Sequence, residues 1–140
     1  MELQLKFIGN PKAVQSFRFT RSGFKYQKKD VVEWKNWVRM QAVSQLPDGF
    51  EMLKDVPLRV EVEFIFSAPK SWSKKKLAKL TDGETIYKIT KPDLTDNLMK
   101  GLIDALSGII WERDQQICRV ESVKKYGENA KTLLKVEKLV

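Results

Sequence analysis

Three aspartates and one lysine between residues 93 and 114 have the side-chain types and spacing that phosphate-ester chemistry needs: Asp93, Asp96, Lys100 and Asp114. The chain contains no histidine and a single cysteine, so histidine general bases, Ser-His-Asp triads and cysteine-based zinc sites are excluded. Carboxylates, lysine, tyrosine or a metal held by oxygen ligands remain. Mg²⁺ or Mn²⁺ held by carboxylates can activate water against phosphorus, which is the chemistry of a metal-dependent nuclease.

The spacing of these residues sorts their candidate roles. Asp93 and Asp96 are three residues apart across an expected helix start, so their side chains can converge. Asp104 lies about 12 Å further along the helix than Asp96, so the two cannot bind one ion and Asp104 is expected to support the site or the fold. Asp114 follows a loop that can fold back toward the helix start. Lys100 lies one turn after Asp96, where it can bind a phosphate or stabilise transition-state charge.

Each of these residues also has an ordinary structural interpretation. Aspartate at a helix start commonly caps the helix and interacts with its dipole. Asp96 and Lys100 have the spacing of a helical i,i+4 ion pair. Asp114 can be a solvated loop residue. The residues alone leave both interpretations open.

Periodicity predicts the elements that must position the four residues. Alternation of apolar and polar residues predicts strands over residues 3–7, 58–66, 117–125 and 132–140, and a short strand around Phe17 and Phe19 before a turn at Ser22 and Gly23. Helical spacing predicts helices over residues 29–46, 74–80 and 96–107. Ser73 and Thr95 are the expected N-caps of the second and third helices, and Gly108 is the expected end of the third. This order predicts an α+β fold, a small mixed sheet packed with helices, as a single domain over residues 1–140.

The charge balance indicates a polyanionic partner. The net charge is +8, which favours nucleic acid or an anionic membrane surface. No run of 18 apolar residues exists and the N-terminus has no signal-peptide core, so we expect no membrane association and a cytoplasmic location. The predicted DNA-contacting lysines lie in and after the basic stretch: Lys70, Lys74, Lys75, Lys76, Lys88 and Lys91, with Lys79 in the same stretch.

The basic stretch also has a plainer interpretation, as the solvated face of a helix. Trp72 and Tyr87 can stack on an unpaired base, but burial at a sheet edge is the stronger expectation for each. We expect Cys118 to be a small buried apolar residue and Trp111 to pack the loop that aims Asp114.

The segment from Lys91 to Gln116 resembles the RusA-type Holliday junction resolvases. Those proteins carry a segment similar to Lys-Pro-Asp-Leu-Asp-Asn, then a helix with a lysine and Asp-Ala-Leu, then a Gly, a Trp and an acidic pair before Gln. The corresponding residues here are Lys91-Pro92-Asp93-Leu94, Asp96-Asn97, Lys100, Asp104-Ala105-Leu106, Gly108, Trp111 and Asp114-Gln115.

The resemblance implies a RusA-like fold and a homodimeric, Mg²⁺-dependent endodeoxyribonuclease, with Mn²⁺ as a possible substitute. Such enzymes recognise four-way DNA junctions and resolve them by paired symmetric nicks in recombination and repair. The resemblance assigns metal-ligand roles to Asp93, Asp96 and Asp114, and a phosphate or transition-state role to Lys100. Family members are common in phages and prophages, so a bacterial or phage-infected cell is the expected setting.

Two departures from the family pattern matter. Thr95 is inserted relative to the commonest spacing, so either the loop before the helix absorbs it or Asp93 swings away. Arg113 replaces the first acid of the usual pair, for which Glu112 can compensate. The alternative function is therefore a non-catalytic junction-binding or DNA-binding module of the same fold. A third hypothesis is a basic protein that binds other proteins, and this hypothesis predicts no salt-sensitive affinity for DNA.

Overall fold

The computed structural model describes residues 2–12, 18–19, 25–26 and 29–139. They fall into two compact units. The first unit comprises Met1–Pro11, Asp55–Lys91 and Gln115–Val140, and the second comprises Lys12–Lys54 and Pro92–Asp114. The expectation of one domain over residues 1–140 stays a prediction.

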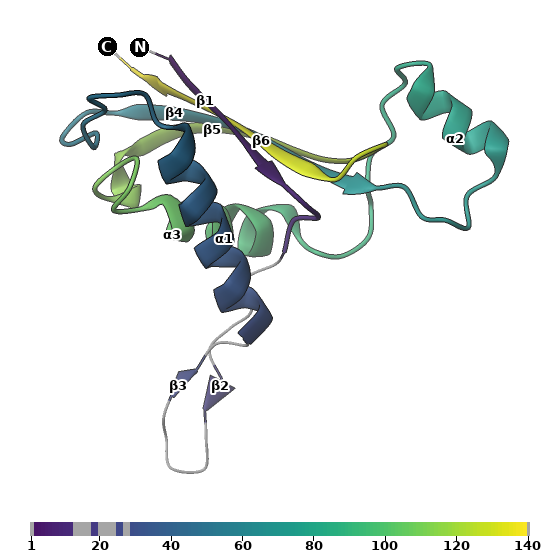
Figure 1. The fold of residues 1–140 in the computed structure, drawn as a ribbon, viewed down its shortest axis with the longest axis horizontal. Coiled ribbons are helices and arrows are strands. Elements are labelled where there is room, and N and C mark those ends of the chain that lie inside the picture. Colours follow the sequence, from purple (N-terminus) through teal and green to yellow (C-terminus); the bar gives the residue numbers. More distant parts are fainter. Residues whose placement is uncertain (1, 13–17, 20–24, 27–28, 140) are drawn as a thin grey trace. The chain divides into compact units, whose positions relative to one another are not determined.

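A mixed four-stranded sheet forms the first unit (Figure 1). Its strands lie in the order β1 (Glu2–Ile8), β6 (Lys131–Lys138), β4 (Leu58–Ser67) and β5 (Ile117–Gly127). β6 runs antiparallel to both β1 and β4, whereas β4 and β5 are parallel. With the helices of the chain, this sheet confirms the α+β class.

The alternation of apolar and polar side chains along the strands decides which face of the sheet is buried. Alternate residues of β1, β4 and β6 are buried, as the period of two predicts. The other face carries ion pairs that link neighbouring strands. Arg59 on β4 pairs with Glu121 on β5 at 2.9 Å and with Glu137 on β6 at 3.7 Å. These contacts lie on three adjacent strands, so they support the register of the sheet.

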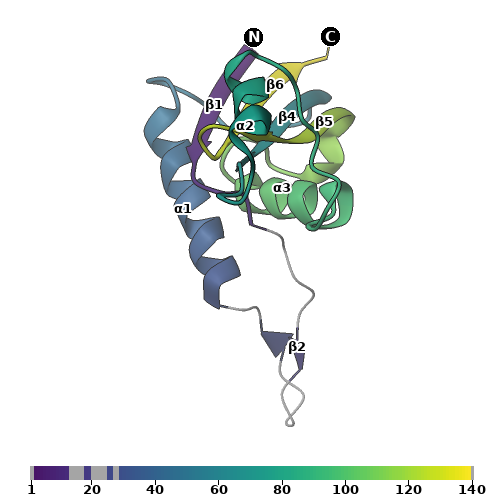
Figure 2. The same ribbon diagram turned by 90° about the vertical axis from the view of Figure 1, so that its right-hand side faces the viewer.

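Helix α2 (Lys74–Thr81) lies beyond one end of this sheet, and Figure 2 looks at the unit from that end. The Oγ of Ser73 accepts a hydrogen bond from the backbone N–H of Lys76 at 3.2 Å, which confirms the predicted N-cap. At the other end of the helix, the Thr81 hydroxyl donates to Glu128 at 3.0 Å.

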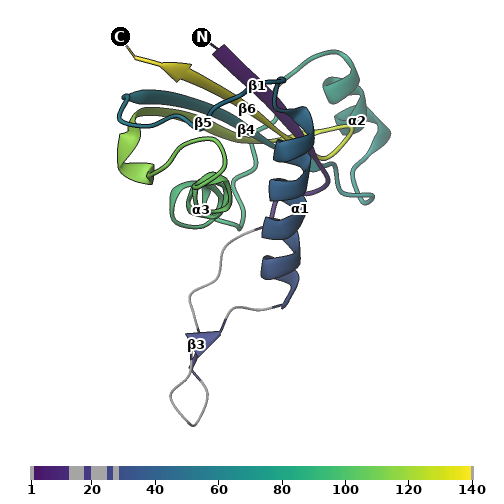
Figure 3. The same cartoon turned by 60° about the vertical axis from the view of Figure 1, so that its left-hand side comes forward.

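The second unit is built from helices and a hairpin. Helix α1 (Lys29–Gln45) buries Trp34, Val38 and Ala42 along one stripe and packs against α3 (Lys100–Leu106), as Figure 3 shows. A π-helical turn, η1 (Leu94–Met99), leads directly into α3. Strands β2 (Arg18–Phe19) and β3 (Lys25–Tyr26) pair antiparallel. The predicted strand residue Phe17 and the predicted turn at Ser22 and Gly23 lie outside the described residues.

Three local predictions are wrong. The N-cap of the third helix is Asp93, since the helical backbone begins at Leu94 and includes Thr95. Cys118 is exposed, because it is the extra residue at the register shift where β5 pairs with Leu58 and Arg59. Tyr87 is 64% exposed, since only its backbone pairs with the outer edge of β5, opposite Lys125. Among the described residues, no helix is long and apolar enough to cross a membrane.

Candidate active site

The first helical turn after Asp93 is wider than an α-helical turn. The carbonyl oxygen of Asp93 accepts a hydrogen bond from the N–H of Leu98, five residues later, at 3.1 Å. Leu98 and the following Met99 are buried and fix the inner face of this turn. A π-helical turn holds one more residue than an α-helical turn and is frequent at functional sites. The inserted Thr95 is therefore absorbed inside the first turn of the helix, and not in the loop before it.

Three charged side chains near this helix start make no capping hydrogen bond or ion pair among the described residues. Asp93 occupies the N-cap position with an extended backbone, but its carboxylate makes no capping hydrogen bond. Asp96 and Lys100 are both exposed, and among the described residues they form no ion pair despite their i,i+4 spacing. The side-chain capping interpretation thus fails for Asp93, and the ion-pair interpretation fails for Asp96 and Lys100, whereas Asp96 lies in the first helical turn, where the helix dipole favours an acid.

Asp114 is placed by a loop with a buried anchor. Trp111 is fully buried, and its indole Nε1 donates to the Oγ of Ser107 at 3.0 Å. The backbone N–H of Gly108, with φ of 87°, donates to the carbonyl of Trp111 at 2.7 Å, so the chain turns tightly after α3. Asp114 itself is exposed and begins the short 3₁₀ helix η2 (Asp114–Gln116).

A second set of contacts holds the same loop from the N-terminal side. The N–H of Leu53 donates to the carbonyl of Ile110 at 2.8 Å, and the N–H of Glu112 donates to the carbonyl of Leu53 at 3.0 Å. Leu53 and Ile110 are both buried. The expectation that Trp111 packs the loop before Asp114 agrees with this arrangement. Glu112 and Arg113 are both exposed.

All four candidate residues belong to the second unit, but the acids do not form a ready three-ligand cage. In the parts of the chain that the structure describes, no three Asp, Glu or Cys side chains are grouped closely enough to hold a metal ion. The donor chemistry nevertheless fits Mg²⁺, because Asp93, Asp96 and Asp114 offer exposed carboxylate oxygens. Mg²⁺ commonly keeps several waters and takes only one or two carboxylates together with substrate phosphates. Asp93 and Asp96, three residues apart at the helix start, are two exposed carboxylates of the kind that this smaller requirement calls for.

The predicted DNA-contacting lysines all lie in the first unit. Lys70, Lys74, Lys75, Lys76 and Lys91 are exposed. Lys88 is half-buried, and its Nζ donates to the Thr90 hydroxyl at 2.7 Å and to the Tyr126 hydroxyl at 3.4 Å. Lys88 therefore has a structural role in addition to its charge.

Tyr126 is a residue that sequence reasoning missed. Burial raises the pKa of its hydroxyl, but hydrogen bonds with Thr90 and Lys88 and the positive charge of Lys88 and Lys76 outweigh burial, so the pKa is lowered overall. Its ring also packs edge-on against Trp72, with centroids 4.7 Å apart. The pairing of residues 86–88 with the edge of β5 brings Lys88 beside Tyr126, and no local sequence signal indicates that pairing.

Comparison with known proteins decides the family. The family model described as Endodeoxyribonuclease RusA matches residues 9–137 of this chain. The chain belongs to the RusA endodeoxyribonuclease family. This match extends the resemblance of residues 91–116 to both units of the structure. The four candidate residues therefore lie within a nuclease family's fold.

The chain is also similar to the protein of Bacillus subtilis (strain 168) named Uncharacterized protein YqaN. The two are 34% identical over 97 residues, which is 68% of this chain and 65% of YqaN. The aligned region thus leaves about a third of YqaN unmatched.

Proposed function

We propose that this chain is a Mg²⁺-dependent endonuclease that resolves four-way (Holliday) DNA junctions by paired symmetric nicks. The observation that carries the proposal is a set of charged side chains at the π-helical turn, Asp93, Asp96 and Lys100, which make no capping bond or ion pair among the described residues, within a chain of the RusA family. We expect it to act in recombination and repair in the cytoplasm of a bacterial or phage-infected cell. Mn²⁺ is expected to substitute for Mg²⁺.

Each side chain has a role in this proposal. Asp93 and Asp96 would hold the ion at the helix start, and Asp114 would join them from the loop that Trp111 anchors. The ion, when bound, supplies positive charge that activates water and offsets charge on the phosphate. Lys100, one turn further along the helix, would contact the scissile phosphate and stabilise the charge that develops as the P–O bond breaks.

A homodimer suits this reaction. Two opposed strands of a four-way junction are cut symmetrically, and a two-fold dimer presents two identical sites. A dimer would also carry twice the +8 charge of one chain, which favours binding to a densely charged branched DNA.

The alternative is a DNA-binding module that keeps the fold without cutting. Two observations favour it: Arg113 stands where the family pattern has an acid, and the described residues contain no preformed three-carboxylate group. Cleavage distinguishes the two functions, because a binding module holds the junction with or without metal and never nicks it.

The test compares Asp96→Asn with the matched control Asp48→Asn. Both residues are exposed and lie in the second unit, and both changes remove one negative charge. Asp96→Asn should abolish Mg²⁺-dependent cutting while preserving or strengthening junction binding, because it removes negative charge beside the phosphate. Asp48→Asn should still cut. Retained cutting by Asp96→Asn would refute the site, and a wild-type chain that binds without cutting in Mg²⁺ or Mn²⁺ would favour the binding module.

A further inference from the structure

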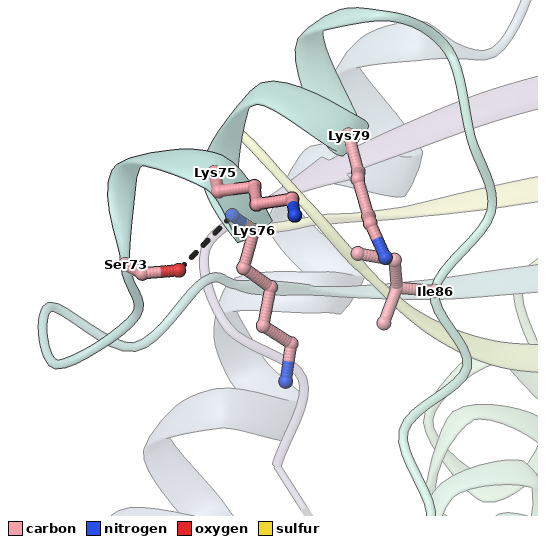
Figure 4. Close-up of a pocket in the computed structure, with 5 residues that line it drawn as sticks. All are labelled: Ser73, Lys75, Lys76, Lys79 and Ile86. Atoms are coloured by element: carbon pink, nitrogen blue, oxygen red, sulfur yellow. Dashed lines mark hydrogen bonds between the residues drawn. The ribbon is translucent and has the colours of Figure 1, made fainter.

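A lysine-lined cavity lies against α2, in the first unit. It has a volume of about 300 Å³ and is lined by Ser73, Lys75, Lys76, Lys79 and Ile86 (Figure 4). Lys75 and Lys79 are four residues apart, and Lys76 and Lys79 are three apart, so all three lysines start from one side of the helix, and the Lys76 side chain extends away from the other two (Figure 4). Ile86, from the segment after α2, adds an apolar side chain to the lining, drawn beside the end of the Lys79 side chain in Figure 4.

The charge of this cavity is uncompensated. No acidic residue lines it, and among the described residues Lys75, Lys76 and Lys79 form no ion pair. Like charges at i,i+4 spacing destabilise a helix, as does positive charge in its first turn. α2 buries no residue, so its lysines do not cover a core. The cluster therefore costs the isolated protein stability, and a bound anion would offset that cost.

One of the three lysines is held in place from behind. The Nζ of Lys76 lies 4.1 Å from the ring centroid of Trp72, within cation–π range. Trp72 is half-buried and packs edge-on against Tyr126 of β5, so its ring is a support for Lys76 and not an open stacking surface. Lys76 is thus connected to the sheet through its contact with Trp72 and the contact of Trp72 with Tyr126.

We propose that this cavity binds a phosphodiester group of the DNA backbone, as an anchoring contact separate from the residues that cut. The inference rests on the proposed function and names where the substrate is held. Lys75, Lys76 and Lys79 would neutralise the phosphate as point charges, and the Ser73 hydroxyl can donate to a phosphate oxygen because only its acceptor side is used in the cap. The Ile86 side chain would lie against the apolar edge of a deoxyribose.

The test is binding in metal-free buffer with EDTA, so that cutting plays no part. The variant Lys75→Gln/Lys76→Gln/Lys79→Gln is compared with Lys12→Gln/Lys54→Gln/Lys138→Gln, which removes the same charge from three exposed lysines outside the cavity. Glutamine has a helix propensity close to that of lysine, so α2 should be retained, which circular dichroism checks. Kd for a four-way junction is measured over a range of salt concentrations for wild type and both variants.

The cavity variant should raise Kd about tenfold or more near 0.1 M salt and reduce the slope of log Kd against log salt by about one to three, while the control changes Kd less than about threefold. Equal effects of the two variants, in a wild type that binds and cuts, would overturn the inference and leave the proposed function standing. A wild type that does not bind the junction would overturn both.

A titration with inorganic phosphate distinguishes a free anion from the DNA backbone. Loss of phosphate binding in the cavity variant, with junction affinity unchanged from wild type, would assign the cavity to a free phosphate and overturn the DNA contact.

Discussion

Ser107→Ala tests whether the buried Trp111 anchors the loop that leads to Asp114. The Ser107 hydroxyl donates to the carbonyl of Ile103 at 2.9 Å and accepts the indole N–H of Trp111 at 3.0 Å. The Ile103 carbonyl would keep the backbone N–H of residue 107, which lies at 3.0 Å. The substitution therefore leaves one orphaned polar group, the indole N–H of a fully buried tryptophan.

The expected loss of stability follows from the one unpaired group, the indole N–H of Trp111. Leaving one buried donor without an acceptor costs about 1–3 kcal/mol, so the free energy of unfolding should fall by about that amount. Trp111→Phe removes the donor itself and loses only packing volume. In the double variant Ser107→Ala/Trp111→Phe no donor is left unpaired, so its cost should be smaller than the sum of the two single costs by about 1–2 kcal/mol.

Urea unfolding of the wild type, both single variants and the double variant measures this coupling. Single-turnover cutting of a junction should also slow for Ser107→Ala, since the loop before Asp114 loses its anchor. Additive costs in the double variant would refute the hydrogen bond as an anchor. If the Ser107→Ala variant is destabilised but cuts at the full rate, the Ser107–Trp111 hydrogen bond stabilises the fold without positioning Asp114.

Two further perturbations test the site and the sheet separately. Lys100→Ala should lower the single-turnover rate about 10²-fold while changing the free energy of unfolding by less than about 0.5 kcal/mol, because Lys100 is exposed and forms no ion pair with the residues that the structure describes; an unchanged rate would remove it from the mechanism. Arg59→Met should lower the free energy of unfolding by about 1 kcal/mol, because it leaves Glu61, Glu121 and Glu137 facing one another across three strands. That loss should shrink in 1 M salt in urea unfolding, whereas a salt-independent loss would point to packing instead.

The strands of the sheet could be predicted from the sequence because apolar and polar residues alternate along them. The strand predicted over residues 58–66 appears as Leu58–Ser67, with Val60, Val62 and Phe64 buried on one face. In a half-buried strand every second side chain points to the buried face, so the local order of apolar and polar residues is enough to predict the strand. The short basic helix after Ser73 was also predictable from local sequence, because a serine N-cap bonds to a backbone N–H only three residues further along the chain.

The start of the third helix was not accessible in the same way. Capping preferences favoured Thr95, but the helix begins two residues earlier than predicted, with a π-helical turn around the buried Leu98 and Met99. Whether a one-residue insertion widens a turn or lengthens a loop depends on which residues are buried, and that is a tertiary property. Cys118 is a second case, because a residue type that is usually buried here occupies a register shift in an edge strand.

The candidate site was only partly predictable. Family-like spacing identified Asp93, Asp96, Lys100 and Asp114, and the structure places all four in one unit. The metal-ligand roles stay predictions, since convergence of Asp114 with the helix start depends on the path of the loop between them. The cavity against α2 needed the structure, because its lining combines residues of the helix with Ile86 from the segment that follows the helix.

Cutting of a labelled four-way junction, beside a linear duplex of the same sequence, tests the central claim most directly. With Mg²⁺, the wild-type chain should make paired nicks at symmetric positions in two opposed strands of the junction, and leave the duplex intact. Without metal it should bind the junction and make no nick. Junction binding without nicks in both Mg²⁺ and Mn²⁺, or equal cutting of junction and duplex, would contradict a metal-dependent junction resolvase.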